Sequence, residues 1–167
     1  AVEGSVRRAT IAAERCRDLS NVRVVADNIE TLRLEGQYDV VTLIGVLEYS
    51  PLFMPGEDPV GACLRKARSF LKEGGTLLIA IENQLGLKYF AGSSEDHLGQ
   101  PFYGIGDLYG PGTAVTFGRN ELRRRLAEAG FEGVEFFYPF PDYKLPQVIV
   151  SDLARSFPVF RVADLLT

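Results

Sequence analysis

Apolar positions along the chain change repeatedly between a helical period and short continuous runs. In residues 5–17 they recur every three or four positions, and Ser5 is placed to cap the first turn. The same period returns between Asp58, which can cap a helix that has proline in its first turn, and Gly74, which can close it. A third helix is predicted over residues 119–129, with Gly130 as its stop.

Continuous apolar runs between these helices predict strands. They lie at residues 1–3, 22–26, 39–45 and 76–81. Strands that alternate with helices form a mainly parallel sheet, and a strand as uniformly apolar as 76–81 suits a sheet covered on both faces. Two further runs, 134–140 and 147–151, are joined by a connection too short for a crossover helix, so we expect them to be antiparallel. The predicted fold class is α/β, with a mainly parallel sheet that ends in an antiparallel hairpin.

Composition is that of an ordinary folded domain. Of 167 residues, 46% are hydrophobic and 24% are charged, which argues against disorder. The net charge of −4 argues against a nucleic-acid-binding surface, because binding to phosphates requires clustered Lys and Arg. The densest basic run, residues 123–125, falls inside a predicted helix and is interpreted as its solvated face.

Two cysteines, Cys16 and Cys63, lie far apart on the apolar faces of predicted helices. They show neither metal-ligand spacing nor a disulfide framework, so we predict no metal site and interpret both as small core residues in a reducing compartment. No apolar run approaches the ~18–20 residues that cross a bilayer, and no signal peptide is visible. Because the chain opens at Ala1 in the middle of a structural unit, we expect a fragment of a longer cytoplasmic protein.

Polar residues gather where the predicted parallel strands end. Glu3, Asp27, Glu48 and Glu82 stand at four such ends, and Gly45 lets a ligand approach the backbone there. Ligands of open α/β sheets bind at this edge, where a carboxylate can accept the hydroxyls of a ribose or the amine of an adenine. Each acid alone is better explained as a turn former or helix cap than as a functional residue. Their recurrence at one edge indicates a nucleotide-like ligand.

Several consecutive segments resemble the motifs of class I S-adenosylmethionine (SAM)-dependent methyltransferases. They lie at residues 2–5, 23–30, 38–49, 71–80 and 117–131. The terminal hairpin corresponds to the reversed strand of that family. The resemblance covers nearly all of residues 1–151, which we take as a partial methyltransferase domain, and leaves residues 152–167 as a tail or the start of a further segment. The family's first strand and its glycine-rich turn are missing, since both would precede Ala1.

The resemblance implies SAM as the cofactor and assigns its adenosine end to the first two predicted strands. Glu3 would accept the ribose hydroxyls, and Asp27 would accept the adenine amine. Asn28 and Ile29 would border the adenine ring. The glycine-rich turn, which supports the methionine carboxylate and amine in the family, has no counterpart here.

The methionine end and the methyl acceptor are assigned, through the same resemblance, to the end of the strand at 39–45. Gly45, Val46 and Leu47 would line the methionine end, and Glu48 and Tyr49 would face the acceptor. These two residues, together with His97, are the candidate catalytic residues. The reaction implied is methyl transfer from SAM to a small-molecule or saccharide acceptor.

A long segment at residues 84–118, rich in aromatic residues, Gly and Pro, lies where this family builds its acceptor site. Such segments are functional lids or disordered, and the aromatic content favours a lid. Its motifs resemble methyltransferase domains associated with bacterial glycosyltransferases, which implies a saccharide acceptor. His97, beside Glu95 and Asp96, can serve as a general base. An exposed loop histidine is the alternative, and the loop context favours it.

Two other functions compete with methyl transfer. The first is a binding or scaffold domain that keeps the fold without catalysis. The second is an NAD-dependent oxidoreductase, which the terminal hairpin and the lack of a Tyr-x-x-x-Lys pair disfavour.

The segment 39–45 also bears on self-association. Without the family's first strand it has one unpaired edge, and because it carries no Pro or Lys it is a template for pairing with another chain. We therefore expect a homo-oligomer through that edge, or a rearranged sheet in which residues 22–26 pair with 39–45.

Overall fold

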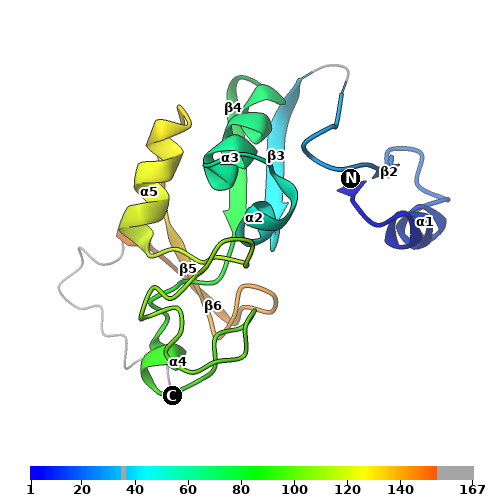
Figure 1. Ribbon diagram of the computed structural model, residues 1–167. Coiled ribbons are helices and arrows are strands. Elements are labelled where there is room, and N and C mark those ends of the chain that lie inside the picture. Colours follow the sequence, from blue (N-terminus) through cyan, green and yellow to red (C-terminus); the bar gives the residue numbers. More distant parts are fainter. Residues whose placement is uncertain (35–36, 154–167) are drawn as a thin grey trace.

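The computed structural model describes residues 1–34 and 37–153. Its first part is a small parallel unit in which strand β1 (Val2–Glu3) pairs with strand β2 (Val25–Ala26) across helix α1 (Val6–Arg15) (Figure 1). The Ser5 side chain caps α1 by accepting from the backbone N–H of Arg8, as its position before the apolar repeat predicts. Because β2 pairs with β1, the rearranged sheet considered above is not formed.

A second parallel pair carries the core. Strand β3 (Tyr38–Ile44) pairs with strand β4 (Leu71–Ala80) in continuous register from Val40 and Thr76 onward. The register shifts between Tyr38 and Val40, so the start of β4 is irregular. Helix α3 (Pro59–Ser69) connects the two strands and begins at Asp58, which accepts from the backbone N–H of Gly61 at 3.0 Å.

Helix α5 (Arg119–Glu128) packs against α3, and the core lies where these helices meet β3. The cluster consists of Leu43, Leu47, Val60, Cys63, Leu64, Ala67, Phe117, Leu122, Leu126 and Ala129. The opposite face of β3 and β4 is different, because Val40, Ile44 and Leu78 are exposed there. The expectation of a strand covered on both faces is therefore wrong for the described residues.

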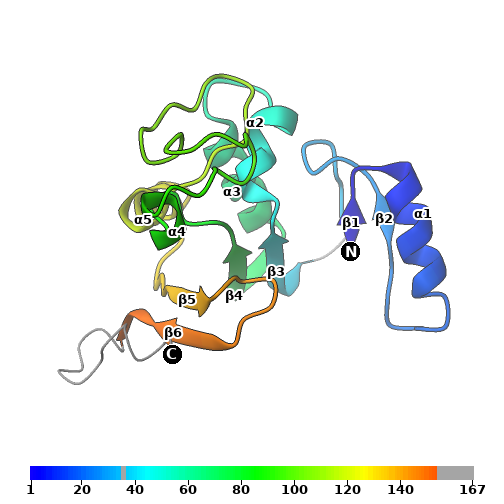
Figure 2. The ribbon, with the colours of Figure 1, turned by 90° about the horizontal axis from the view of Figure 1, so that it is seen from below.

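The last strands, β5 (Phe137–Phe140) and β6 (Val148–Ser151), form the predicted antiparallel hairpin. Figure 2 shows this hairpin beyond β4, while β1 and β2 lie on the opposite side of β3. Within the described residues, the strands form three separate two-stranded sheets, and β3 pairs with β4 alone. The mainly parallel order ending in a hairpin is confirmed, but one edge of β3 is open.

The segment 84–118 is folded back on itself. Its ends meet, since the backbone N–H of Gln84 donates to the carbonyl oxygen of Phe117 and Gly118 N–H donates to the Gln84 side chain. It contains the short helix α4 (Leu87–Phe90), which follows Gly86. Two further short helices, η1 (Leu47–Tyr49) and α2 (Ser50–Phe53), follow β3 and face this segment from the sheet edge.

Two predicted details are wrong. The helix that begins at Asp58 does not continue to Gly74 but ends at Ser69, and Leu71 already belongs to β4. Gly74, with φ of +73°, lies within the irregular part of that strand, so its backbone freedom serves a bulge and not a helix cap. Most of the predicted tail 152–167 lies outside the described residues.

The cysteines differ from each other. Cys63 is buried in the core as expected, and burial raises the pKa of its thiol to about 12. Cys16 is only partly buried because α1 packs mainly on the small β1–β2 pair, so the prediction that it is a core residue is wrong.

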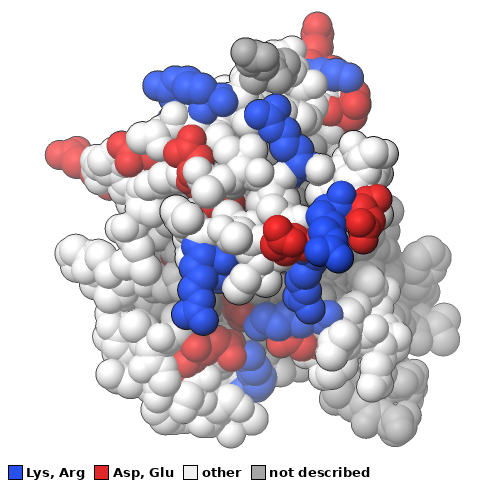
Figure 3. Space-filling view, turned by 90° about the vertical axis from the view of Figure 1, so that its right-hand side faces the viewer, with Lys and Arg blue, Asp and Glu red and all other residues white. Residues whose placement is uncertain are grey.

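Charged side chains of both signs are interspersed on the face shown in Figure 3. The basic run at 123–125 is also balanced by nearby acids, because Arg124 and Arg125 both pair with Glu121 on the same helix. Within the residues that the structure covers, the helices are all too short or too polar to cross a bilayer.

Candidate functional site

Glu3 is held at the end of β1 by neighbours in its own chain. One carboxylate oxygen accepts from the backbone N–H of Ser5 at 2.8 Å and from the Arg8 guanidinium at 2.7 Å. The hydrogen bond from Arg8 is the main cause that lowers the pKa of this carboxyl, so it is ionised near neutral pH. The structure thus presents a fixed carboxylate at the carboxyl end of a parallel strand.

Asp27 stands at the neighbouring strand end, and its backbone N–H donates to the carbonyl oxygen of Glu3 at 3.2 Å. Its side chain accepts from the N–H of Asn28 at 2.7 Å and from the Thr31 hydroxyl at 2.9 Å. Asn28 is exposed, whereas Ile29 is partly buried against the core. The structure therefore places Glu3 and Asp27 side by side, and both also have turn-forming contacts.

The turn after β3 requires a glycine because of its backbone conformation and of the side chains packed against it. Gly45 has φ of +61°, and a Cβ added there would lie 3.2 Å from the Tyr143 hydroxyl and 3.5 Å from Glu48 Oε1. Val46 is partly buried against the core, and Leu47 is completely buried within it. Leu47, as described, therefore presents no accessible surface to a ligand.

Three acid–base side chains that lie far apart in the sequence meet behind this turn. Glu48 comes from η1, Glu82 follows β4, and His97 comes from the segment 84–118. The His97 Nε2 atom lies 3.8 Å from Glu82 Oε2 and 4.0 Å from Glu48 Oε1. The side chains of Glu48, Glu82 and His97 are only 2%, 8% and 6% exposed. We call these three residues the carboxylate–histidine cluster.

Glu95 fixes the histidine of this cluster. Its carboxylate accepts from the backbone N–H groups of His97 at 2.8 Å and Leu98 at 2.7 Å, and it lies 2.9 Å from His97 Nδ1. Tyr109 donates to the same carboxylate at 3.4 Å and shares a 2.5 Å hydrogen bond with Thr116. The interpretation of His97 as an exposed loop histidine is therefore wrong, because Glu95 turns its ring into the protein.

Tyr49 covers the cluster from outside. Its ring meets the His97 ring edge-on, with centroids 5.2 Å apart, and its side chain is exposed. Burial is the main cause that raises the pKa of Glu48, and the pKa of Tyr49 is raised by burial and by the negative charge of Glu48. Of the three candidate catalytic residues, only Tyr49 is directly accessible.

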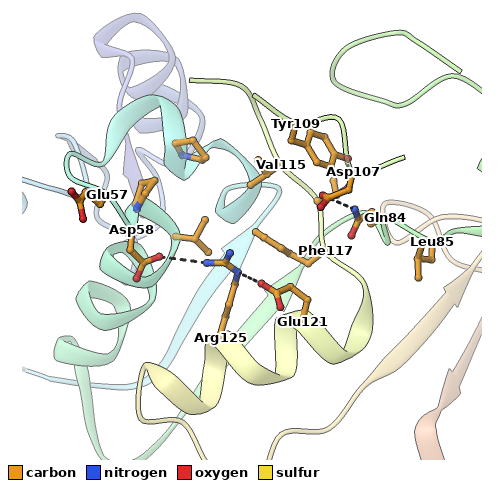
Figure 4. Close-up of a pocket in the computed structure, with 14 residues that line it drawn as sticks. Glu57, Asp58, Gln84, Leu85, Asp107, Tyr109, Val115, Phe117, Glu121 and Arg125 are labelled. Carbon is orange, nitrogen blue, oxygen red and sulfur yellow. Dashed lines mark hydrogen bonds and ion pairs between the residues drawn. The ribbon is translucent and has the colours of Figure 1, made fainter. Parts of the chain in front are cut away.

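A separate pocket of about 550 Å³ opens between α3, α5 and the segment 84–118 (Figure 4). Arg125 crosses its floor, with Asp58 at 3.4 Å and Glu121 at 2.8 Å. None of the predicted site residues lines it, although Tyr109 borders it and also reaches the Glu95 carboxylate. Tyr109 therefore lies between the pocket and Glu95, the residue that contacts His97 of the cluster.

Sequence reasoning identified Glu48, Tyr49 and His97, and the structure brings these three together. It named Glu95 only as an acid beside His97 and did not predict that Glu95 holds the histidine ring in place. Lys144, whose ammonium lies 3.2 Å from Glu82 Oε1, was missed as well. It comes from the hairpin connection, and no local pattern indicates that this connection folds over the cluster.

Neither a protein-family model nor a curated protein sequence matches this chain. Several solved structures do match it. A SAM-dependent methyltransferase from Thermotoga maritima, described as a possible histamine N-methyltransferase, superposes with a TM-score of 0.57 at 24% identity over 90% of this chain. The SAM-dependent methyltransferase SibL in its apo form superposes with a TM-score of 0.55 at 20% identity, also over 90% of this chain.

The chain spans 63% of the length of the first structure and 41% of the second. In both comparisons the likeness lies in the backbone arrangement, and it agrees with the order of parallel pairs and terminal hairpin described above. The chain therefore has the Rossmann-like α/β fold of the class I SAM-dependent methyltransferases.

Proposed function

We propose that this chain is the main part of a SAM-dependent methyltransferase domain that acts on a small-molecule or saccharide acceptor. The observation that carries the proposal is the pair of carboxylates, Glu3 and Asp27, at adjacent carboxyl ends of parallel strands in this fold. Residues 1–151 would form the domain, and residues 84–118 its acceptor-side insertion.

The chemistry of these residues suits the adenosine end of SAM. Glu3 is ionised and held in place by Arg8, so its carboxylate is available as an acceptor for ribose hydroxyls. Asp27 offers an acceptor for the adenine amine, next to the exposed Asn28. At the methionine end, the positive φ of Gly45 turns the backbone of residues 45–47 along the sheet edge.

SAM, when bound, would supply an activated sulfonium methyl group, so that positioning the acceptor contributes much of the rate. Tyr49 is the accessible side chain beside this edge, and Glu48 and His97 lie behind it. The insertion adds the exposed aromatic rings of Phe90 and Phe102. We propose that the acceptor binds against Tyr49 and the insertion, with Glu48 and His97 setting the charge behind it.

Glu3→Ala and Asp27→Ala are each expected to weaken SAM binding about tenfold or more, because each removes a charge-assisted hydrogen bond to the ligand. Calorimetric titration with SAM measures the effect. Glu14→Ala is the matched control, since Glu14 is an exposed carboxylate near the C-terminal end of α1, and its removal should leave the affinity unchanged. Unchanged affinity in both acid variants would contradict the site, and no SAM binding by the unsubstituted protein would favour a non-catalytic scaffold.

We also propose that the 167-residue chain self-associates through the open edge of β3. That edge lies beside an exposed apolar face that includes Val40 and Ile44, and unpaired edges attract further strands. Light scattering coupled to size exclusion should detect a dimer or larger species that grows with concentration. Val40→Lys, which places a charge on this face, is expected to shift the population toward monomer. A monomer at all concentrations would contradict this interface.

A further inference from the structure

We infer that the carboxylate–histidine cluster binds one divalent transition-metal cation of the Zn²⁺ type through Glu48, Glu82 and His97. This inference does not rest on SAM binding, because it concerns another ligand and residues other than Glu3 and Asp27. It does involve Glu48 and His97, which are proposed above to lie behind the acceptor. One donor atom from each of the three side chains lies within 4.8 Å of the others.

Two carboxylate oxygen atoms of the cluster lack partners. Glu48 Oε2 and Glu82 Oε2 are buried and accept no hydrogen bond from any described residue. Both side chains are more than nine-tenths buried. Burying an ionised carboxylate without a partner is costly, so native proteins pair such groups or use them to coordinate metals. The two orphan oxygens therefore indicate a missing positive ligand.

The histidine is held in the tautomer that a metal requires. An ionised carboxylate only accepts hydrogen bonds, so the 2.9 Å contact with Glu95 requires a proton on His97 Nδ1. In the neutral ring, Nε2 then carries a lone pair directed at the two glutamates. A carboxylate behind a histidine is the usual support of a metal-bound imidazole. At 3.8 and 4.0 Å, Nε2 is too far from either glutamate for a hydrogen bond.

Distances and charge both suit a dication. Donors of a tetrahedral site with metal–ligand distances of about 2.0–2.2 Å lie roughly 3.4 Å apart, so small side-chain shifts would close the cluster on an ion. In the deprotonated form that coordinates a metal, Glu48 and Glu82 together with Glu95 carry three negative charges, and Lys144, which pairs with Glu82, compensates one. Two positive charges are left to be supplied.

The donor set selects the class of ion. Mg²⁺ and Ca²⁺ take oxygen ligands, whereas an imidazole combined with carboxylates suits Zn²⁺ and its neighbours in the first transition row. The three side chains are almost completely enclosed, which leaves a site for an ion in preference to an organic cation. We therefore expect Zn²⁺, and Co²⁺ as its spectroscopic substitute, to bind in preference to Mg²⁺ and Ca²⁺.

The test is a titration of the metal-free 167-residue protein with Zn²⁺, Co²⁺, Mg²⁺ and Ca²⁺. One equivalent of Zn²⁺ should bind, Co²⁺ should give visible absorption that Zn²⁺ abolishes, and Glu82→Gln and His97→Gln should each lower Zn²⁺ affinity at least tenfold. Asp39→Asn is the matched control, since Asp39 is an exposed carboxylate that pairs with Lys72 near the start of β3, at the opposite end of that strand from Glu48, and it should change the affinity less than twofold.

A second measurement needs no variant. His97 is the single histidine of the chain, so the ring ¹⁵N resonances of the unsubstituted protein report on it alone. Zn²⁺ should shift Nε2 strongly while Nδ1 stays protonated. Unshifted Nε2 with excess Zn²⁺, equal affinity for Mg²⁺, or Zn²⁺ affinity unchanged in both cluster variants would overturn the inference. A SAM titration of the same sample tests the proposed function without reference to Zn²⁺, so a failure of SAM binding and a failure of Zn²⁺ binding can be told apart.

Discussion

Leu64→Ala is expected to lower the free energy of unfolding by about 2–5 kcal/mol, the largest loss we foresee from a single substitution. Leu64 lies on α3, has no exposed surface, and belongs to the cluster that joins this helix to α5 and β3. Its removal forfeits the transfer free energy of the buried side chain and leaves a cavity that rigid neighbours fill only in part. Urea unfolding followed by circular dichroism measures the change.

Leu52→Ala is the matched control for that experiment. The chemistry is the same, but Leu52 on α2 is 56% exposed, so the cost should stay below about 0.5 kcal/mol. Similar losses in both variants would mean that α3 does not sit at the centre of the core.

Glu48→Gln is expected to raise the free energy of unfolding of the metal-free protein by about 1–3 kcal/mol, in contrast to Leu64→Ala. In the absence of a cation, Glu48 and Glu82 both hold a buried carboxylate oxygen without a partner, and burial already raises the pKa of Glu48. A glutamine is neutral, and its amide can donate to the orphan oxygen of Glu82. Urea unfolding in the presence of a chelator measures the difference.

Adding Zn²⁺ should make the unsubstituted protein more stable than Glu48→Gln, because the unsubstituted protein gains stability from binding and the variant does not. Glu14→Gln serves as the control, since Glu14 is largely exposed on α1 and should respond to neither change. If Glu48→Gln destabilised the metal-free protein, the Glu48 carboxylate would be satisfied by a protonated His97, and the account of the cluster as incomplete would fail.

Local sequence patterns predicted the elements of this fold well. The caps at Ser5 and Asp58, the buried face of α5 and the antiparallel hairpin follow from spacing over a few residues, and the structure confirms them. The end of α3 was missed because the apolar spacing runs on to Leu71, where pairing with Tyr38 makes that residue part of β4. Tertiary pairing there overrides the local helical period.

The site was predictable only in part, for a related reason. Strand ends indicated Glu3, Asp27, Glu48 and Glu82 because the carboxyl edge of a parallel sheet is set by topology. No periodicity places His97 against Glu48, because the segment between 84 and 118 folds through turns and side-chain contacts such as those of Gln84. The metal hypothesis was likewise invisible in the sequence, since its three ligands share no short spacing.

The division of the molecule into two parallel pairs bears on how a ligand would bind. The first pair, with α1, touches the rest through few groups, notably Ile29 at the edge of the core and the Lys66 ammonium on the Leu32 carbonyl oxygen at 2.8 Å. Regions with few buried apolar contacts open locally more often than a core does. Glu3 and Asp27 lie on this smaller part, and Gly45 lies on the larger one. A ligand that spans both would bind only while they are docked, so its observed affinity would fall with the docked population and its presence would hold the halves together.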